Sequence, residues 1–278
     1  MKIHTEEWDN GNLIVNSEYT ELLKGNDIET ATSLFDLDSE TVKAIVKERG
    51  TSRAVLKGNQ GGVEVFIKRY SPVPLKEKIK LKLFRKPPTA DAFDEWKAIV
   101  TFHEQALNTM IPIAVARIGE KTCNLTLGIQ NYVRASDLLA SFTAVDIDRK
   151  RNLLKNIAEL SGKIHVGNMA HQDLYMVHFF VKEDEDDAVY LIDLQRTLIQ
   201  KKLARRWHVK DLAQLLFSAG STVDQDDINY FWDIYTGIVD VKLREDHVFI
   251  NEVKSKADRI NKRDLRKAAQ RIANTSSK

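Results

Sequence analysis

Residues 169–196, MAHQDLYMVHFFVKEDEDDAVYLIDLQR, decide the fold class of this chain. Two short apolar segments, 179–182 and 188–192, flank five consecutive acidic residues, which is the pattern of a β-hairpin with a polar tip. Asp173 precedes the first segment and Asp193 follows the second. We therefore expect the hairpin to bring two aspartates to one end of a small sheet.

A pair of aspartates in such a place suits phosphoryl transfer. One carboxylate can receive the proton of an acceptor hydroxyl, and the other can hold the magnesium ion that bridges the phosphates of ATP. An HxD triplet alone would fit an ordinary hairpin with surface acids. Here HxDL at 171–174 is joined by His178 and by a second aspartate at a strand end, and this combination favours a kinase-like site.

The stretch resembles the catalytic and metal loops of the protein-kinase-like fold, H-R-D-x-x-x-x-N and D-F-G. Within that fold, HxDLxxxHFF followed by a strand ending in IDLQR is similar to the lipopolysaccharide core heptose kinases, a bacterial family of small phosphotransferases. The resemblance runs from about residue 50 to 216. It implies a two-lobed α+β protein. The N-lobe, residues 1–133, would hold a five-stranded antiparallel sheet and one main helix, and the C-lobe, residues 134–278, would be mostly helical.

By this resemblance Asp173 is the catalytic base and Asp193 the magnesium ligand. Asp211 resembles the helix aspartate that braces the catalytic loop through its backbone amides. His178 stands where protein kinases have the asparagine that binds a second magnesium ion, which makes it a second candidate ligand. Because magnesium prefers oxygen ligands, we expect His178 to orient Asp193 or to contact a phosphate rather than to bind metal strongly. The lipopolysaccharide heptose kinases share this histidine, which favours them over the related Kdo kinase.

Lys68 ends the strand pattern VEVFIK and resembles the lysine that holds the α- and β-phosphates of ATP. A lysine at a strand end is commonly only solvated, so the assignment depends on a partner. A helix predicted from Asp91 onward supplies one by resemblance, since Glu95 lies in its first turn. Asp94 is the nearest competitor for that role.

The loop that covers the nucleotide departs from the kinase pattern in this sequence. Strand patterns at 42–48 and 53–57 are joined by residues 49–52, RGTS, where a kinase has its glycine-rich loop. Only one glycine is present, so a phosphate cradle must use the backbone amides and hydroxyls of Thr51 and Ser52.

Two further strand patterns, 113–118 and 123–132, complete the predicted sheet. The second runs into Asn131 and Tyr132, where the fold has its hinge and an adenine ring would pair with backbone groups. Apolar residues at steps of four, three and four from residue 153 predict a core helix in the C-lobe.

Basic residues follow Asp193 and should flank the opening for the acceptor: Arg196, Lys201, Lys202, Arg205 and Arg206. Core saccharides carry Kdo carboxylates and lipid A phosphates, which arginine binds with paired hydrogen bonds. The alternative is that these side chains only solvate a loop. Two other basic segments, 76–86 and 254–278, fit either a solvated face or contact with anionic lipid.

Composition bounds the remaining possibilities. The chain has 278 residues, 43% hydrophobic and 29% charged, which suits one large or two small domains with a real core. A net charge of +2 argues against bulk nucleic-acid binding, and the single cysteine fits a reducing compartment. The N-terminal MKIHTEEWDN lacks the apolar core of a signal peptide, and no apolar run approaches the roughly 18 residues of a membrane span. We expect a cytoplasmic protein, at most peripheral on the inner membrane.

Together these features predict an ATP-dependent kinase that phosphorylates a heptose of the lipopolysaccharide inner core at the cytoplasmic face of the inner membrane. Another small-molecule kinase of the same fold, of the Kdo, aminoglycoside or choline class, stays open. A protein kinase is disfavoured, because the helix at Asp211 begins only eighteen residues after Asp193 and no A-P-E motif is present. A non-catalytic binding module is disfavoured by the intact set of Lys68, Asp173 and Asp193.

Overall fold

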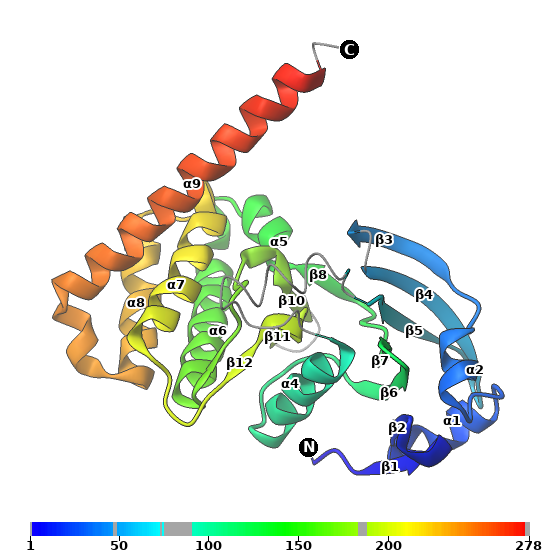
Figure 1. Ribbon diagram of the computed structural model, residues 1–278. Helices are drawn as coiled ribbons and strands as arrows, with labels where there is room; N and C mark the ends of the chain where they lie inside the picture. Colours follow the sequence, from blue (N-terminus) through cyan, green and yellow to red (C-terminus); the bar gives the residue numbers. More distant parts are fainter. Residues whose placement is uncertain (1, 47–48, 73, 75–90, 183–187, 276–278) are drawn as a thin grey trace. The chain divides into compact units, whose positions relative to one another are not determined.

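The computed structural model describes residues 2–46, 49–72, 74, 91–182 and 188–275 (Figure 1). The chain forms two compact units. One, the sheet unit, contains residues 1–130 together with 193–196. The other, the helical unit, contains residues 131–192 and 197–278. The predicted basic segment at 76–86 and the acidic hairpin tip at 183–187 lie outside the described residues.

The sheet unit is built on a seven-stranded sheet in the order β1-β2-β6-β7-β5-β4-β3, with every neighbouring pair antiparallel. Its strands are β1 (Thr5–Trp8), β2 (Leu13–Asn16), β3 (Glu40–Val46), β4 (Arg49–Gly58), β5 (Gly61–Tyr70), β6 (Pro112–Ile118) and β7 (Lys121–Leu127). The prediction of five strands is therefore wrong. The two additional strands, β1 and β2, extend the sheet beyond β6, where Leu13 and Val15 are fully buried. Asn16 fastens this edge, donating from Nδ2 to the backbone oxygen of Pro112 at 2.9 Å.

The strand that carries Lys68 owes its form to alternation of side chains. In β5, Val65 and Ile67 are fully buried in the core that includes Leu56 and Leu125. Because successive strand side chains point to opposite faces, Lys68 projects from the other face of the sheet. The first residue of β5, Gly61, directly follows the turn from β4 and has φ +131°, a backbone conformation that favours glycine.

In the described part of the sheet unit the helices are short except for one. They are α1 (Thr20–Lys24), α2 (Ala31–Phe35) and α4 (Ala92–Glu104), with 3-10 turns at Asp9–Gly11, Ser17–Tyr19 and Leu194–Arg196 (η5). The predicted main helix is confirmed as α4, which buries Trp96, Ile99 and Phe102 at helical spacing.

The helical unit contains five helices in its described part, and two small sheets. The helices are α5 (Ala135–Ser141), α6 (Ile147–Val166), α7 (Arg205–Ala219), α8 (Gln225–Val239) and α9 (His247–Thr275), with 3-10 turns at Ala144–Asp146, Met176–His178 (η4), Gly220–Thr222 and Val241–Glu245. The sheets run β11-β10-β8 and β12-β9, from β8 (Tyr132–Arg134), β9 (Met169–Ala170), β10 (Phe179–Lys182), β11 (Ala188–Leu191) and β12 (Leu198–Ile199). The predicted hairpin is confirmed, because β10 and β11 pair antiparallel with Phe179 opposite Leu191.

The core of the helical unit lies among α6, α7, α8 and α9. Leu153, Ile157 and Ile164 of α6 are fully buried, which confirms the core helix predicted from their spacing. The last turns of α9 extend away from the helices against which it packs (Figure 1). No helix among the described residues has the length and apolar character needed to cross a membrane.

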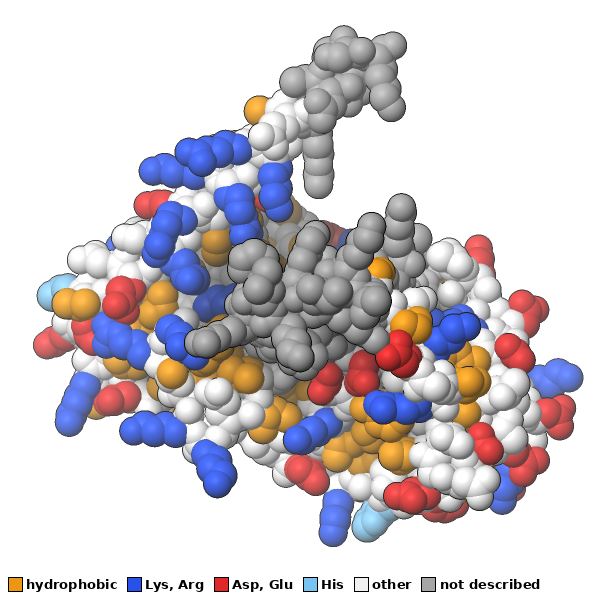
Figure 2. Space-filling view, viewed as in Figure 1, with side chains coloured by type: hydrophobic (Ala, Val, Ile, Leu, Met, Phe, Trp, Pro, Cys, Tyr) orange, Lys and Arg blue, Asp and Glu red, His pale blue; other side chains and the backbone are white. Residues whose placement is uncertain are grey.

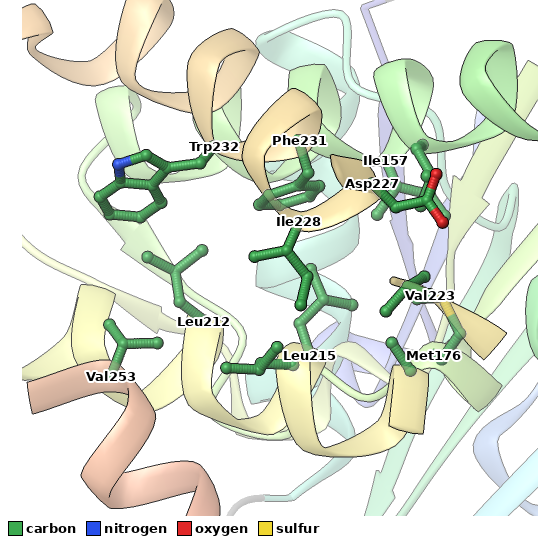
Figure 3. A pocket seen from close by; sticks show the side chains of 13 residues that line it. Ile157, Met176, Leu212, Leu215, Val223, Asp227, Ile228, Phe231, Trp232 and Val253 are labelled. Carbon is green, nitrogen blue, oxygen red and sulfur yellow. The ribbon is translucent and has the colours of Figure 1, made fainter. Parts of the chain in front are cut away.

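A small apolar pocket of about 80 Å³ lies within this core (Figure 3). Figure 3 shows Phe231, Trp232 and Ile228 on one side of it and Leu212 and Leu215 on the other. Its one acidic lining residue, Asp227, forms an ion pair with Lys150. Apart from this ion-paired carboxylate, the side chains of the lining are apolar and offer only van der Waals contact.

Candidate active site

A lysine in the sheet unit joins two carboxylates. Lys68 Nζ lies 2.9 Å from Glu95 Oε1 and 2.8 Å from Asp193 Oδ1. The Glu95 side chain is 1% exposed, and those of Lys68 and Asp193 are 13% and 25% exposed. The ion pair that the resemblance implied between strand and helix is thus present. Contact of Lys68 with ATP phosphates stays a prediction.

The start of α4 explains why Glu95, and not Asp94, reaches the lysine. Asp91 caps the helix, accepting hydrogen bonds from the amides of Phe93 and Asp94 at 2.8 and 3.1 Å. Asp94 in turn accepts from the Asp91 amide at 3.0 Å, which completes a capping box. Asp94 therefore serves the helix end, and the next residue, Glu95, turns inward.

Two neutral side chains complete the environment of Glu95. Its Oε2 accepts a hydrogen bond from the Tyr70 hydroxyl at 2.8 Å and another from Asn124 Nδ2 at 2.8 Å. Both follow from strand geometry: Tyr70 lies two residues after Lys68 on β5, and Asn124 is the register partner of Lys68 on β7. Neither Tyr70 nor Asn124 was predicted from the sequence. The i+2 spacing from Lys68 was the available signal for Tyr70.

The electrostatics of the cluster favour a charged lysine. Burial alone would lower the pKa of Lys68, but the charges of Glu95 and Asp193 and the hydrogen bonds to them outweigh burial and raise that pKa above its usual value. Lys68 thus carries a full positive charge at neutral pH. An anion that enters this site meets a cation already held in place.

The turn that carries Asp193 is anchored within the sheet unit. Asp193 has φ 62°, in the left-handed region that few non-glycine residues adopt. The next two residues, Leu194 and Gln195, are buried in η5, and the side-chain oxygen Oε1 of Gln195 lies 3.2 Å from the Tyr70 hydroxyl oxygen. Tyr70 therefore contacts both sides of the lysine cluster, through Glu95 and through the Asp193 turn.

The side chains of this site can be compared with the ligands that a magnesium ion requires. Among the described residues, no three His, Cys, Asp or Glu side chains are grouped so as to hold a metal by themselves. Magnesium, however, commonly binds one or two carboxylates and takes its other ligands from water and substrate phosphates. The partly exposed carboxylate of Asp193 fits such an ion, one that arrives with a nucleotide.

In the helical unit, Asp211 organises the catalytic loop. It is fully buried in α7 and accepts hydrogen bonds from the backbone amides of His171 and Gln172 at 2.7 and 2.9 Å. Gln172 adopts φ 67°, and the two amides converge on one carboxylate at this bend. The bracing contact that the resemblance implied is present.

Asp173, the predicted base, is held by its neighbours. Gln214 of α7 accepts from the Leu174 amide at 3.2 Å, and its Nε2 lies 3.5 Å from Asp173 Oδ1. His178 Nδ1 lies 2.8 Å from the backbone oxygen of Asp173. Since a carbonyl oxygen only accepts, this nitrogen carries the proton, and His178 acts here on the loop backbone. Gln214 is a third residue that was not predicted from the sequence.

A buried network supports Asp211 from behind. His165 Nε2 lies 3.4 Å from Asp211, and its Nδ1 lies 2.7 Å from the Tyr235 hydroxyl, which also lies 3.0 Å from Nδ1 of His208. Burial, followed by the nearby His165, lowers the pKa of His208 to about 4. At neutral pH His208 is therefore uncharged.

Thr51 and Ser52 do not lie in a loop, contrary to the sequence prediction. Both are inside β4, opposite Lys68 and Ile67 of β5, and Ser52 is buried. The strand continues through Gly50 because the backbone there remains paired with β5. The glycine in the sequence suggested a loop at this position. Asn131, at φ 61°, precedes β8, and Tyr132 begins that strand; their contact with adenine stays a prediction.

The basic residues after Asp193 differ in their surroundings. Arg205 donates to Asp246 at 2.8 Å and to Glu252 at 2.9 Å, and its guanidinium lies 4.8 Å from the Phe249 ring. Arg205 thus connects the start of α7 to α9 and to Asp246, the residue before α9. Arg206 lies over the Trp207 ring at 5.0 Å. The other three are exposed: Arg196, Lys201 and Lys202.

These features define a protein-kinase-like phosphotransferase. They are a strand lysine paired with a helix glutamate, an aspartate after a β-hairpin, and an HxD loop braced by a helix aspartate. The model of the lipopolysaccharide kinase (Kdo/WaaP) family matches residues 38–235, and the chain belongs to this family. The family prediction is therefore confirmed.

Curated relatives and a solved structure agree with this assignment. The lipopolysaccharide core heptose(I) kinase WaaP of Escherichia coli strain K12 is 30% identical over 233 residues, covering 78% of this chain and 87% of that protein. Another Escherichia coli WaaP is 28% identical over 247 residues, covering 82% and 92%. The structure of WaaP in complex with acyl carrier protein superposes with a TM-score of 0.69 at 22% identity, covering 89% of this chain and 98% of that one. This likeness confirms the predicted α+β kinase-like fold.

Proposed function

We propose that this phosphotransferase transfers the γ-phosphate of ATP to a hydroxyl of a heptose in the lipopolysaccharide inner core. The observation that carries the proposal is the bridge from Lys68 to Glu95 and Asp193, which prepares a cation and a carboxylate for a nucleotide. The names of the relatives, heptose(I) kinases, support the choice of acceptor.

In this mechanism the residues of the sheet unit handle the nucleotide. Lys68 contacts the α- and β-phosphates and Glu95 fixes the position of its ammonium group. Asp193 supplies the carboxylate for magnesium, which when bound neutralises charge on the phosphates. Asn131 and Tyr132 offer backbone groups to the adenine ring.

Residues of the helical unit handle the acceptor. Asp173 accepts a hydrogen bond from the acceptor hydroxyl and receives its proton as the new bond to phosphorus forms. Asp211 and Gln214 hold the loop so that this carboxylate is positioned before the substrate arrives. His178 fixes the backbone oxygen of the same residue.

Two single variants test this division of roles. Asp173→Ala and Asp193→Ala should each reduce the rate of transfer by a factor of about 10² to 10⁴, without unfolding the protein. Asp193→Ala should also weaken magnesium-dependent ATP binding, measured by calorimetry, and Asp173→Ala should leave it unchanged. Asp148→Ala, which removes an exposed acid from the first turn of α6, is the matched control. Equal loss of ATP affinity in both site variants would contradict the assignment.

The acceptor is tested against the alternatives of the same fold. Purified protein with ATP is offered lipopolysaccharide that lacks its heptose phosphates, a Kdo-bearing lipid A, an aminoglycoside and choline, and phosphate transfer is followed by mass spectrometry. Transfer to the first alone supports the proposal. Transfer to one of the other acceptors and not to lipopolysaccharide would replace the proposed acceptor by that compound.

Location and lobe boundaries complete the proposal. We propose that the protein acts at the cytoplasmic face of the inner membrane and contacts anionic lipid peripherally, for which Arg266 and Lys267, exposed near the end of α9, supply charge. The two units are proposed to act as an N-lobe and a C-lobe divided near residue 133, close to the division of the chain after Gln130.

A further inference from the structure

A basic pocket of about 330 Å³ lies in the helical unit beside the catalytic loop. Its lining comes from the loop, from α7 and from α9: Tyr175, Lys210, Gln214, Lys256, Arg259, Ile260 and Arg263. Four of these seven residues are Lys or Arg and none is acidic. A concave site lined by charge of one sign attracts ligands of the opposite sign, so the pocket suits an anion.

The pocket is a product of helix packing. Lys256, Arg259 and Arg263 are spaced three and four residues apart, which places them on one face of α9. The neighbouring face of α9 carries Val253 and Ala257, which are buried in the helical core and hold α9 against α7. Figure 2 shows Lys and Arg side chains gathered along this part of α9.

An ion pair elsewhere fixes the two helices. Arg205 at the start of α7 binds Asp246 and Glu252 in and before the first turns of α9. Unlike Arg205, the three cations of α9 that line the pocket form no ion pair with an acidic side chain among the described residues. Their charge is therefore available to a ligand.

The pocket is connected to the catalytic loop by the same two α7 residues that line it. Gln214 contacts the Leu174 amide and lies 3.5 Å from Asp173 Oδ1. Lys210 Nζ donates to Gln172 Oε1 at 3.3 Å. The residues on both sides of the base, and the base itself, are thus in contact with the wall of the pocket.

We propose that this pocket binds a phosphate or carboxylate group of the saccharide acceptor and so positions the acceptor hydroxyl at Asp173. The inference rests on the proposed function and gives the acceptor site a different set of residues from those predicted by sequence. Arginine and lysine bind both anions by charge-assisted hydrogen bonds, so the chemistry of recognition is shared by the two groups.

The test compares two double variants of the full chain that remove the same charge from α9. Arg259→Gln/Arg263→Gln alters the pocket, and Lys254→Gln/Lys262→Gln alters exposed residues of α9 that do not line it. Transfer from ATP to lipopolysaccharide that lacks heptose phosphates is measured in non-ionic detergent, with each substrate varied in turn. The pocket variant should raise the acceptor KM about 10-fold, because two exposed charged contacts are lost, and it should leave the ATP KM unchanged. The control should change neither.

Modified acceptors identify the anion. One has its lipid A phosphates removed by a phosphatase, and the other has its carboxyl groups reduced to alcohols. Wild type should use one of these with a raised KM, and on that acceptor the pocket variant should show no further increase. This result would assign the pocket to the removed group.

Several outcomes would overturn the inference. An unchanged acceptor KM in the pocket variant, with wild type active, overturns it and leaves the proposed function standing. An equal rise in both double variants would show a general effect of the charge of α9, and a rise in the ATP KM alone would assign the pocket to the nucleotide. If the pocket variant loses the same factor on both modified acceptors, neither group binds there. Failure of wild type to phosphorylate lipopolysaccharide would overturn this inference together with the proposed function.

Discussion

The two units each bury a carboxylate, and they compensate its charge differently. In the sheet unit Glu95 faces the ammonium group of Lys68, with Tyr70 and Asn124 as neutral donors. In the helical unit Asp211 receives two backbone amides and has a histidine 3.4 Å away. Both are at most 1% exposed.

The first arrangement can exchange partners when a ligand binds, and the second cannot. A lysine bound to two carboxylates can pass one of its contacts to a phosphate when a nucleotide enters. Backbone amides have no such freedom, so Asp211 fixes the course of the loop around Asp173. Breaking either arrangement should lower stability, and breaking the first should in addition weaken nucleotide binding directly.

Asp211→Ala gives the largest expected effect. It leaves two buried amides without acceptors, and hydrogen bonds to a charged group contribute about 1.5–3 kcal/mol each. The free energy of unfolding should fall by roughly 3–6 kcal/mol, measured by urea denaturation, and transfer should be lost. If the variant unfolds at the same urea concentration as wild type, the two backbone amides do not depend on Asp211 for stability, and the contrast with Glu95 fails.

Lys68→Ala comes next and tests the exchangeable arrangement. It leaves Glu95 buried without its cation, which costs about 3–5 kcal/mol, and it should raise the ATP KM at least tenfold. The added substitution Glu95→Gln should restore much of the stability without restoring the ATP KM. Unchanged ATP kinetics in Lys68→Ala would remove this lysine from the site.

A smaller effect is expected from pH. The pKa of His208 is about 4 in the folded protein, below the value near 6.5 of an unfolded chain. As pH falls from about 6.5 towards 4, the unfolded state therefore binds a proton first and stability is lost. Because His208 is only partly buried, we expect a loss of about 1–2 kcal/mol. The free energy of unfolding is measured between pH 4 and pH 7 for wild type and for His208→Gln. The pH-dependent loss should be smaller in the variant by this amount, and the same pH dependence in both proteins would refute the prediction.

Tyr70→Phe is the smallest change. It removes one hydroxyl that donates to the Glu95 carboxylate. We expect a cost of about 1.5 kcal/mol, the low end for a hydrogen bond to a charged group, because Asn124 and Lys68 still contact this carboxylate. The melting temperature should fall by a few degrees and the ATP KM should rise less than in Lys68→Ala. A loss as large as that of Lys68→Ala would mean that neutral donors, and not the lysine, hold Glu95.

Local periodicity explains what the sequence could predict. The alternation that ends at Lys68 and the helical spacing after Asp91 are properties of neighbouring residues, so β5 and α4 could be located in advance. The hairpin of β10 and β11 was recognisable for the same reason. The assignment of Glu95 over Asp94 followed from resemblance, and its physical cause is the capping box of α4.

Features that depend on distant partners were not visible. Strand β2 is four residues long and is stabilised by pairing with β6, about a hundred positions away in the chain. The position of Asn124 beside Lys68 depends on the register of β5 and β7. Arg205 finds its acidic partners 41 and 47 residues further on, and the basic pocket depends on the same packing of α7 against α9.

The single cysteine has a practical consequence. Cys123 is fully buried in β7, and burial raises the pKa of its thiol to about 12. Alkylating dyes react with the thiolate, so the native protein should remain unlabelled at neutral pH. A new cysteine on the surface would therefore be the one reactive position. With Lys256→Cys, an environment-sensitive fluorophore in the wall of the basic pocket would report anion binding there in real time, without any prior removal of a native thiol.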